Sequence, residues 1–392
     1  MINPEALRQL QTDLGREALA AAAAETPTER EFLSVVQRLR KRYPEPLVMA
    51  AVEQAILRRR GAAKFSRAGE MYFEREALEQ ASSEMVSHYR AERLAGFPCL
   101  YDLGCGLGGD SLALAAVSPV VAIDRDGLRL SLLAANARAL GVEANVWPVR
   151  ADLRLPAWRL SRRAAGFFDP GRRRNGRRVY SVARYEPPLD LAYTWLPELA
   201  ALAVKVSPGI DLRQLSGVDC ELEFISSLGE LKEACLWFGS LRHVQRRATI
   251  LPGPHSLVSS GNLGTGILPP QGYLYEPDPA ILRAGLVGEL ANRLGASQID
   301  ATISYLTSDR AITTPFARVY RVIEVMTSNL RLLRAALRAR GVGRLTLKKR
   351  GSAIDVASYA QRLRLHGDHE ATLILTRAGG RKVALLVEPV AA

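Results

Sequence analysis

The segment that decides the fold is Tyr101-Asp102-Leu103-Gly104-Cys105-Gly106-Leu107-Gly108-Gly109-Asp110. It lies between the apolar run at residues 100–103, which predicts a strand, and residues 111–116, which predict a helix. Because glycine has no side chain, a turn this rich in glycine lets the backbone approach a ligand closely. A strand, a glycine-rich turn and a helix in this order indicate a unit that binds a nucleoside.

Short apolar runs continue to alternate with helix-like segments after this turn. They predict strands at residues 100–103, 120–123, 146–149, 167–168 and 202–206, with two further candidates at 221–225 and 244–250. Such alternation is typical of βαβ units and a parallel, doubly wound sheet. We therefore expect an α/β fold with a Rossmann-like sheet of seven strands. Residues 251–271 are rich in Gly and Pro and predict a loop or linker.

Acidic residues stand at the ends of three successive predicted strands. Asp102 lies two positions before Gly104, Asp124 ends the second strand, and Asp152 follows the third. The carboxylate of Asp124 is well placed to accept hydrogen bonds from both hydroxyls of a ribose, and that of Asp152 to accept one from an adenine amino group. Each acid alone is also a common helix N-cap. Their joint placement beside the glycine turn favours a nucleoside pocket.

The choice of nucleoside depends on Asp102. Gly104, Gly106 and Gly109 also fit the G-x-G-x-x-G spacing of dinucleotide-binding proteins, so an NAD-dependent oxidoreductase stays an alternative. Asp102 would face a pyrophosphate unfavourably, whereas it suits a ligand with an ammonium or sulfonium group. S-adenosylmethionine carries both cations and no phosphate. The sequence therefore predicts S-adenosylmethionine as the cofactor.

Over about residues 98–250 the chain resembles the class I S-adenosylmethionine-dependent methyltransferases. Residues 102–106 match the first motif of that family, Asp124 the second and Asp152 the third. More narrowly, the chain is similar to bacterial methyltransferase-like proteins with a C-terminal THUMP-like domain, through residues 73–81, 169–173, 204–209, 275–279 and 348–351. The resemblance implies a cofactor site made of Asp102, Leu103, Gly104, Cys105, Gly106, Asp124, Arg125, Ala151, Asp152 and Asp169.

The end of the fourth predicted strand bears on catalysis. Amino-methylating relatives carry an Asp or Asn there, then two prolines and an aromatic residue, and only Asp169-Pro170 match. Methyl transfer from a sulfonium depends mainly on aligning the nucleophile, so we expect Asp169, with Pro170, to orient the methyl acceptor. Gly171 and Arg172 replace the second proline and the aromatic residue. A non-catalytic RNA-binding or assembly protein that retains the cofactor pocket therefore stays an alternative.

The charge balance points to a polyanionic partner. The chain has 53 Lys and Arg against 40 Asp and Glu, a net charge of +13. Two basic clusters are placed to contact phosphates: Arg172 and Arg173 directly follow Asp169, and Lys348, Lys349 and Arg350 lie in the THUMP-like region. THUMP domains are associated with RNA binding. The resemblance thus implies RNA, either ribosomal or transfer RNA, as the substrate.

The periodicity divides the chain into four regions. We expect an N-terminal helical region at 1–95, the methyltransferase domain at 96–250, a linker and helical connection at 251–318 with one helix at 280–294, and a THUMP-like α+β domain at 319–392. The last region follows the order strand, helix, strand, helix, hairpin, with the hairpin turn at Gly379-Gly380.

The remaining sequence features are mostly exclusions. The apolar run at residues 18–24 is too short to cross a membrane, and the first seventeen residues lack the pattern of a signal peptide, so we expect a cytoplasmic protein. Four cysteines without a C-x-x-C pair predict neither disulfides nor a metal site.

Overall fold

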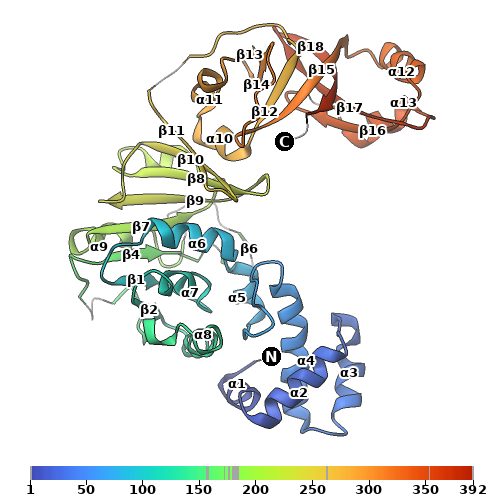
Figure 1. The fold of residues 1–392 in the computed structure, drawn as a ribbon. Coiled ribbons are helices and arrows are strands. Elements are labelled where there is room, and N and C mark those ends of the chain that lie inside the picture. Colours follow the sequence, from blue (N-terminus) through green and yellow to red (C-terminus); the bar gives the residue numbers. More distant parts are fainter. Residues whose placement is uncertain are drawn as a thin grey trace. The chain divides into compact units, whose positions relative to one another are not determined.

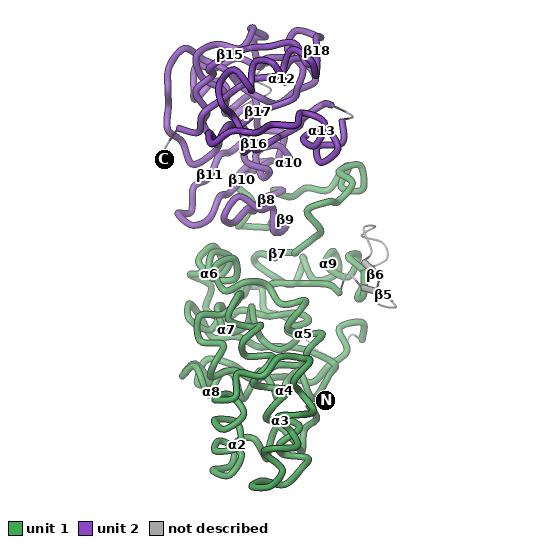
Figure 2. Tube along the Cα trace, turned by 90° about the vertical axis from the view of Figure 1, so that its right-hand side faces the viewer, with its two compact units in different colours: residues 1–221, 234–243 green, residues 222–233, 244–392 purple. Residues whose placement is uncertain are grey.

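The computed structural model describes residues 2–155, 159–171, 173–174, 177–178, 185–261, 264–352 and 354–390. The chain divides into two compact units, residues 1–221 with 234–243 and residues 222–233 with 244–392 (Figure 2). Each unit has its own buried apolar clusters. No helix in the described part of the chain combines the length and the apolar character needed to cross a membrane.

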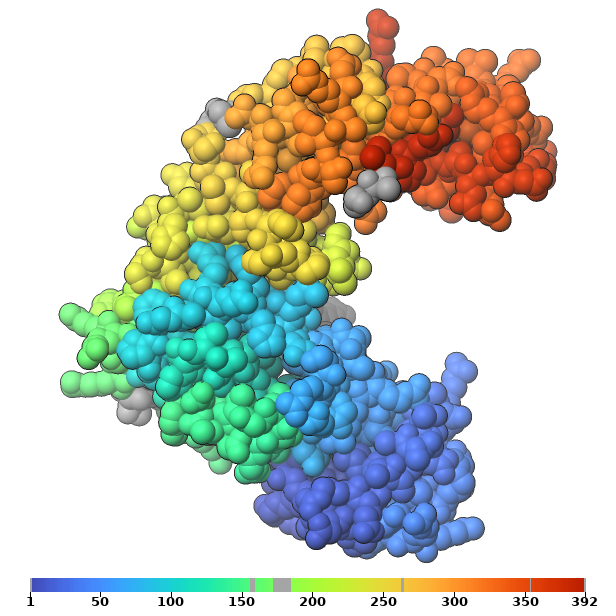
Figure 3. Space-filling model, viewed as in Figure 1, coloured from blue at the N-terminus to red at the C-terminus, as the bar shows by residue number. Residues whose placement is uncertain are grey.

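The first unit opens with the predicted helical region. The side chains of Asn3 and Thr12 cap its first two helices, and Thr28 and Glu31 form a capping box ahead of the third. Leu132 of a later helix belongs to the same buried cluster, so the blue N-terminal helices lie directly against the green segment in Figure 3. The helices are α1 (Pro4–Leu10), α2 (Asp13–Ala24), α3 (Phe32–Leu39) and α4 (Glu45–Gly61).

A parallel α/β sheet follows, as Figure 1 shows. Strands β1, β2, β3, β4 and β7 are parallel to their neighbours, and β9 runs antiparallel to β7. Helices connect β1 to β2, β2 to β3 and β4 to β7, so parallel neighbours are what the sequence pattern requires. The strands are β1 (Leu100–Leu103), β2 (Val120–Asp124), β3 (Val146–Arg150), β4 (Ala165–Phe168), β7 (Ala201–Val206) and β9 (Glu230–Gly239). The helices of this part are α5 (Arg75–Gln80), α6 (Glu84–Arg93), α7 (Gly109–Ala115), α8 (Gly127–Leu140) and α9 (Asp190–Trp195).

The Rossmann-like α/β fold is confirmed, and its sheet is larger than the seven strands predicted from the sequence. The hydrogen-bonded order is β11-β10-β8-β9-β7-β4-β1-β2-β3, a sheet of nine strands. Strand β9 lies outside all predicted strands, and β11 lies in the segment predicted as a loop. Strands β8 (Glu221–Ser227) and β10 (Arg246–Leu251) match the two further candidates predicted at 221–225 and 244–250, so the two added strands are β9 and β11 (His255–Val258). A two-stranded hairpin, β5 (Arg173–Arg174) and β6 (Arg177–Arg178), follows β4.

The second unit contains a sheet of seven strands in the order β13-β14-β12-β15-β18-β17-β16. The predicted C-terminal order of strand, helix, strand, helix and hairpin is confirmed. Gly379 and Gly380 form the hairpin turn with φ of +53° and +78°, a left-handed backbone that favours glycine. The elements are β15 (Ala317–Thr327), α12 (Leu330–Ala339), β16 (Val342–Lys349), α13 (Val356–Leu363), β17 (His369–Ala378) and β18 (Arg381–Pro389).

The sequence predicts a linker and helical connection at residues 251–318, but these residues also supply three strands to this second sheet. These are β12 (Tyr273–Pro277), β13 (Ser297–Asp300) and β14 (Ile303–Ser308). The single helix predicted at 280–294 is wrong, since two helices, α10 (Pro279–Ala284) and α11 (Val287–Leu294), occupy it. Gly285 adopts φ +72° directly after α10 and ends it.

Candidate active site

The carboxyl ends of the parallel strands of the first unit border a cavity of about 490 Å³. In open α/β sheets ligands bind at this edge, where the loops after several strands meet. Loops after β1, β2, β3 and β4 all contribute to the lining, together with α5 and α8. The cavity brings together ten of the residues predicted from the sequence: Asp102, Gly104, Cys105, Gly106, Asp124, Arg125, Ala151, Asp152, Asp169 and Pro170.

Other predicted site residues lie elsewhere. The side chain of Leu103 is fully buried within the sheet and is not part of the cavity lining. Its role is to pack beneath the glycine turn rather than to contact a ligand. Arg172 lies outside the described residues, and Arg173 is described only as part of the backbone of β5, without its side chain. The proposed contacts of these two arginines with substrate therefore stay predictions.

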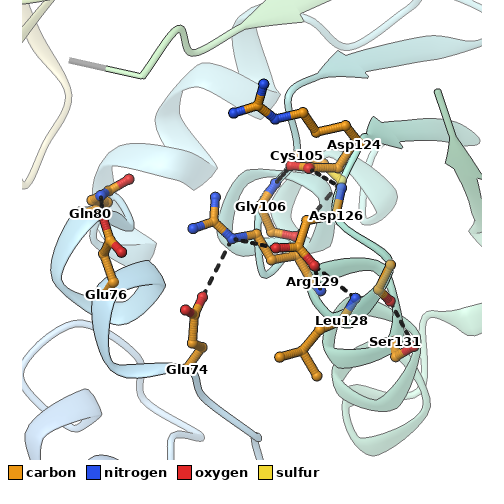
Figure 4. A network of polar contacts seen from close by, with 12 residues as sticks. Glu74, Glu76, Gln80, Cys105, Gly106, Asp124, Asp126, Leu128, Arg129 and Ser131 are labelled. Atoms are coloured by element: carbon orange, nitrogen blue, oxygen red, sulfur yellow. Dashed lines mark hydrogen bonds and ion pairs between the residues drawn. The ribbon is translucent and has the colours of Figure 1, made fainter. Parts of the chain in front are cut away.

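Asp124 fixes the shape of the glycine turn. Its Oδ2 accepts a hydrogen bond from the Gly106 backbone N–H at 2.9 Å, and its Oδ1 accepts one from the Asp126 N–H at 2.9 Å (Figure 4). Gly104 and Gly106 have φ of +93° and +56°, and no atom lies within 4 Å of the place where a Cβ of Gly106 would stand. The turn therefore offers bare backbone to a ligand beside a carboxylate that is already held in place.

A wall of the cavity comes from a segment for which the sequence suggested no site role, residues 74–81. Glu74 faces Arg129 of α8, with 3.4 Å between its Oε2 and the arginine Nε, and Gln80 donates to Glu76 at 3.0 Å (Figure 4). Lys64 fixes the end of α5 because its ammonium donates to three backbone carbonyls at 2.8–2.9 Å, those of Leu78, Glu79 and Ala81.

Two acids near the glycine turn, the buried Asp102 and the largely buried Asp110, have opposite electrostatic environments. Burial alone would raise the pKa of Asp110, but the nearby Arg90 and Lys205 lower it below its usual range. Burial, followed by the charge of Asp110, raises the pKa of Asp102 to about 8. The hydroxyl of Ser111 donates to Asp102 at 2.5 Å, and no salt bridge to Asp102 is present among the described residues. Asp102 is thus a buried carboxyl on the cavity wall that has no ion-pair partner of opposite charge among the described residues.

The unbalanced Asp102 predicts a pH-dependent gain in stability for Asp102→Asn. Because its pKa of about 8 lies above the ordinary 3.8, the folded chain keeps a proton that the unfolded chain loses, so Asp102 lowers the stability of the wild type progressively from about pH 4 to about pH 8. Without ligand, thermal unfolding of the variant and the wild type should coincide near pH 4, with the variant more stable by on the order of 5 °C at pH 8.

The exposed Asp368 supplies the control, because Asp368→Asn removes a carboxylate outside the site. A variant Asp102→Asn that is less stable than the wild type at pH 8 would show that this carboxyl is not electrostatically strained.

Two further cavity residues are constrained by their neighbours. Asp152 accepts from both Nε and Nη2 of Arg154, at 2.9 and 2.5 Å, and this pairing lowers the pKa of Asp152. Burial raises the pKa of the Cys105 thiol well above its usual value, so Cys105 is a packing residue rather than a nucleophile. Within the described residues no group of His, Cys, Asp and Glu forms a metal site.

Asp169 lies at the end of β4, in the wall of the same cavity, and about a quarter of its side chain is exposed. Its Oδ2 accepts a hydrogen bond from the ammonium of Lys205 at 2.6 Å. Sequence reasoning included Lys205 only as part of residues 204–209, and nothing in that pattern shows that its side chain reaches Asp169.

The three basic residues predicted in the C-terminal region have separate environments. Lys348 forms an ion pair with Glu276 and donates to the Tyr320 hydroxyl at 2.7 Å. Lys349 donates to a backbone carbonyl at 2.8 Å, and the guanidinium of Arg350 lies 5.1 Å from the ring centre of Tyr305. Lys348 therefore has an intramolecular role, joining two motifs that are distant in sequence.

The donor and acceptor set of the cavity fits S-adenosylmethionine. Asp124 and the glycine turn could hold a ribose through the carboxylate and the bare backbone, and the buried carboxyl of Asp102 could pair with a cation.

Known proteins match both parts of the chain. The family described as THUMP domain-like matches residues 317–389, a domain of unknown function matches 3–61, and the family described as RNA cap guanine-N2 methyltransferase matches 98–167. An uncharacterized S-adenosylmethionine-dependent methyltransferase of Mycobacterium tuberculosis H37Rv is 36% identical over 342 residues, covering 84% of this chain and 92% of that protein. A solved structure of a proposed methyltransferase from Porphyromonas gingivalis W83 has a TM-score of 0.74 at 23% identity, covering 93% of this chain and 100% of that one, so the fold is shared.

Proposed function

The chain belongs to the S-adenosylmethionine-dependent methyltransferases, and from this premise we propose that its methyl acceptor is RNA, either ribosomal or transfer RNA. Membership in this family makes S-adenosylmethionine the cofactor and excludes the NAD-dependent alternative. The observation that carries the RNA proposal is the distribution of charge. Residues 317–389 contain 15 Lys and Arg against 5 Asp and Glu, a net charge of +10 out of +13 for the whole chain. A module this basic suits a phosphate backbone.

The matched families add support from both units of the chain. The match at residues 98–167 is to an RNA methyltransferase family, and the match at 317–389 is to a THUMP domain-like family. We propose that the C-terminal module binds RNA and that the catalytic unit methylates it. A non-catalytic protein that keeps the cofactor pocket is the outcome that the experiment below has to exclude.

Different residues of the chain would bind the cofactor and orient the methyl acceptor. Bound S-adenosylmethionine supplies an electrophilic methyl group. Asp124, which holds the Gly106 N–H, would accept from the ribose, and Asp102 would lie toward the cationic end of the cofactor. Asp169 and Pro170 orient the acceptor at the cavity wall. With the cofactor bound, Asp169 and Pro170 would hold the acceptor in line with the methyl group, and the proton that the acceptor loses would pass to solvent.

The first prediction of this proposal concerns cofactor binding. In calorimetric titration, S-adenosylmethionine and S-adenosylhomocysteine should bind and NAD should not. Asp124→Ala should weaken both by about tenfold or more, because it removes charged hydrogen bonds to the ribose and loosens the turn. Binding by NAD alone would contradict the cofactor assignment.

RNA as the acceptor is tested with labelled cofactor. Total RNA from cells that lack the gene should gain a labelled methyl group that ribonuclease releases and that separates with a ribosomal or transfer RNA fraction. Label in protein or small molecules instead would refute the RNA proposal. Cofactor binding with no transfer to any fraction would favour the non-catalytic alternative.

A further inference from the structure

Lys205 is a buried cation that stands behind the cavity wall. It lies in β7, and only 4% of its side chain is exposed. Its ammonium donates to Oδ2 of Asp169 at 2.6 Å and to the hydroxyl of Ser82 at 2.8 Å. Asp169 lines the cavity, whereas Lys205 is not part of the lining. Lys205 therefore does not touch a ligand in this cavity itself, and its contact with the cavity wall is through Asp169.

The contacts of Lys205 tie together several elements of the first unit. The Ser82 hydroxyl, just before α6, also lies 3.5 Å from Oδ2 of Asp110 in α7, and Asp110 forms a buried ion pair with Arg90 of α6. Two ion pairs, Lys205 with Asp169 and Arg90 with Asp110, are thus linked through one hydroxyl. Because a buried charge is costly without a partner, this network has little freedom to rearrange.

We propose that Lys205 is a positioning residue for methyl transfer, which takes up one carboxylate oxygen of Asp169 and leaves the other to the methyl acceptor. The inference rests on the proposed function. A carboxylate free to rotate would offer either oxygen in many directions. With Oδ2 held from behind, Asp169 presents Oδ1 in one orientation, as alignment of a nucleophile requires.

The ammonium also sets the charge that the acceptor meets. Asp169 paired with Lys205 is a hydrogen-bond acceptor with little net charge, so it suits a neutral N–H or O–H donor better than a cation. Removing the ammonium while keeping Asp169 should make that wall of the cavity attractive to a positive group.

A binding experiment without RNA tests this expectation. Sinefungin carries an amine where S-adenosylmethionine carries its methyl group, and S-adenosylhomocysteine carries nothing there. The ratio of their Kd values reports the charge that the transferred group meets. In Lys205→Met, sinefungin should gain about tenfold over S-adenosylhomocysteine relative to the wild type. In Lys205→Met with Asp169→Asn, that gain should disappear.

Two further variants separate positioning from support of the fold. Lys205→Gln keeps a donor for Asp169 and Ser82 but no charge, so it should show the same gain if Lys205→Met does not fold. Lys205→Arg keeps the charge and should stay near the wild-type ratio. Equal weakening of both ligands in Lys205→Met and Lys205→Gln, with the ratio unchanged, would overturn the proposal.

Transfer assays add a second readout. With labelled cofactor and RNA, Lys205→Gln should lower kcat by about tenfold or more while the KM for S-adenosylmethionine changes little. Wild-type kcat in this variant would also overturn the inference. If the wild type labels no RNA, the proposed function fails. The ratio of the Kd values for sinefungin and S-adenosylhomocysteine still tests whether Lys205 pairs with Asp169 and neutralises its charge.

Discussion

Replacing Asp169 by asparagine is expected to reduce methyl transfer to RNA by about 100-fold or more, while the Kd for S-adenosylmethionine changes far less. The side chain lines the cavity at the end of β4. Asparagine keeps its size but turns one oxygen into an NH₂ donor. That donor would face either the acceptor's own N–H or the ammonium of Lys205, so the acceptor loses its alignment in both cases.

Single-turnover labelling with excess enzyme measures this step, because it separates transfer from product release. Asp211→Asn is a matched control, since Asp211 also pairs with a cation, Arg213, at 2.7 Å but lies outside the cavity lining. It should transfer methyl groups at the wild-type rate. Transfer by Asp169→Asn within about threefold of the wild type would show that another group aligns the acceptor.

The sequence predicts the catalytic fold well where strands are short and apolar. Strand β1 has the predicted bounds, and β2, β3 and β7 each differ from their predicted bounds by one residue. The sequence does not predict strand β9, because its first residues include the charged Glu230, Lys232 and Glu233 and do not resemble a buried strand. Its buried half, residues 234–238, is apolar throughout. That run, after the turn at Leu228-Gly229, was a usable hairpin signal.

The second unit shows the limit of reading loops from composition. Residues 251–271 contain many Gly and Pro, which predict a linker, yet His255 to Val258 pair with β10. Composition describes how a segment bends but not which strand lies beside it. The helix predicted at 280–294 has helical spacing throughout, and only Gly285, a left-handed stop, breaks it.

At the site, local motifs predict the glycine turn and its acids because neighbouring strands end at the same edge of the sheet. Contacts between distant segments are different. Lys205 and Asp169 are 36 residues apart, and Arg90 and Asp110 are 20 apart. Nothing in the spacing says that these charges meet, since the pairing depends on how α6 and β7 pack on the sheet.

The buried pair of Arg90 and Asp110 gives the largest expected change in stability. Only 1% of the Arg90 side chain and 14% of the Asp110 side chain are exposed. The guanidinium also lies 4.8 Å from the ring centre of Phe167. Arg90→Met keeps much of the volume and the packing on that ring but leaves a buried carboxylate without its main partner. Breaking such a pair costs about 3–5 kcal/mol, or a fall in Tm on the order of 10 °C.

The double variant Arg90→Met with Asp110→Asn identifies the cause, because removing both charges should recover much of the lost stability. The pH dependence has a definite sign. Arg90 and Lys205 hold the pKa of Asp110 below its usual range against burial, so loss of Arg90 raises that pKa, and the single variant should approach the wild type as the pH falls toward 4. A loss of stability that is equal at pH 4 and pH 8, with no recovery in the double variant, would assign the role of Arg90 to packing on Phe167 rather than to its charge.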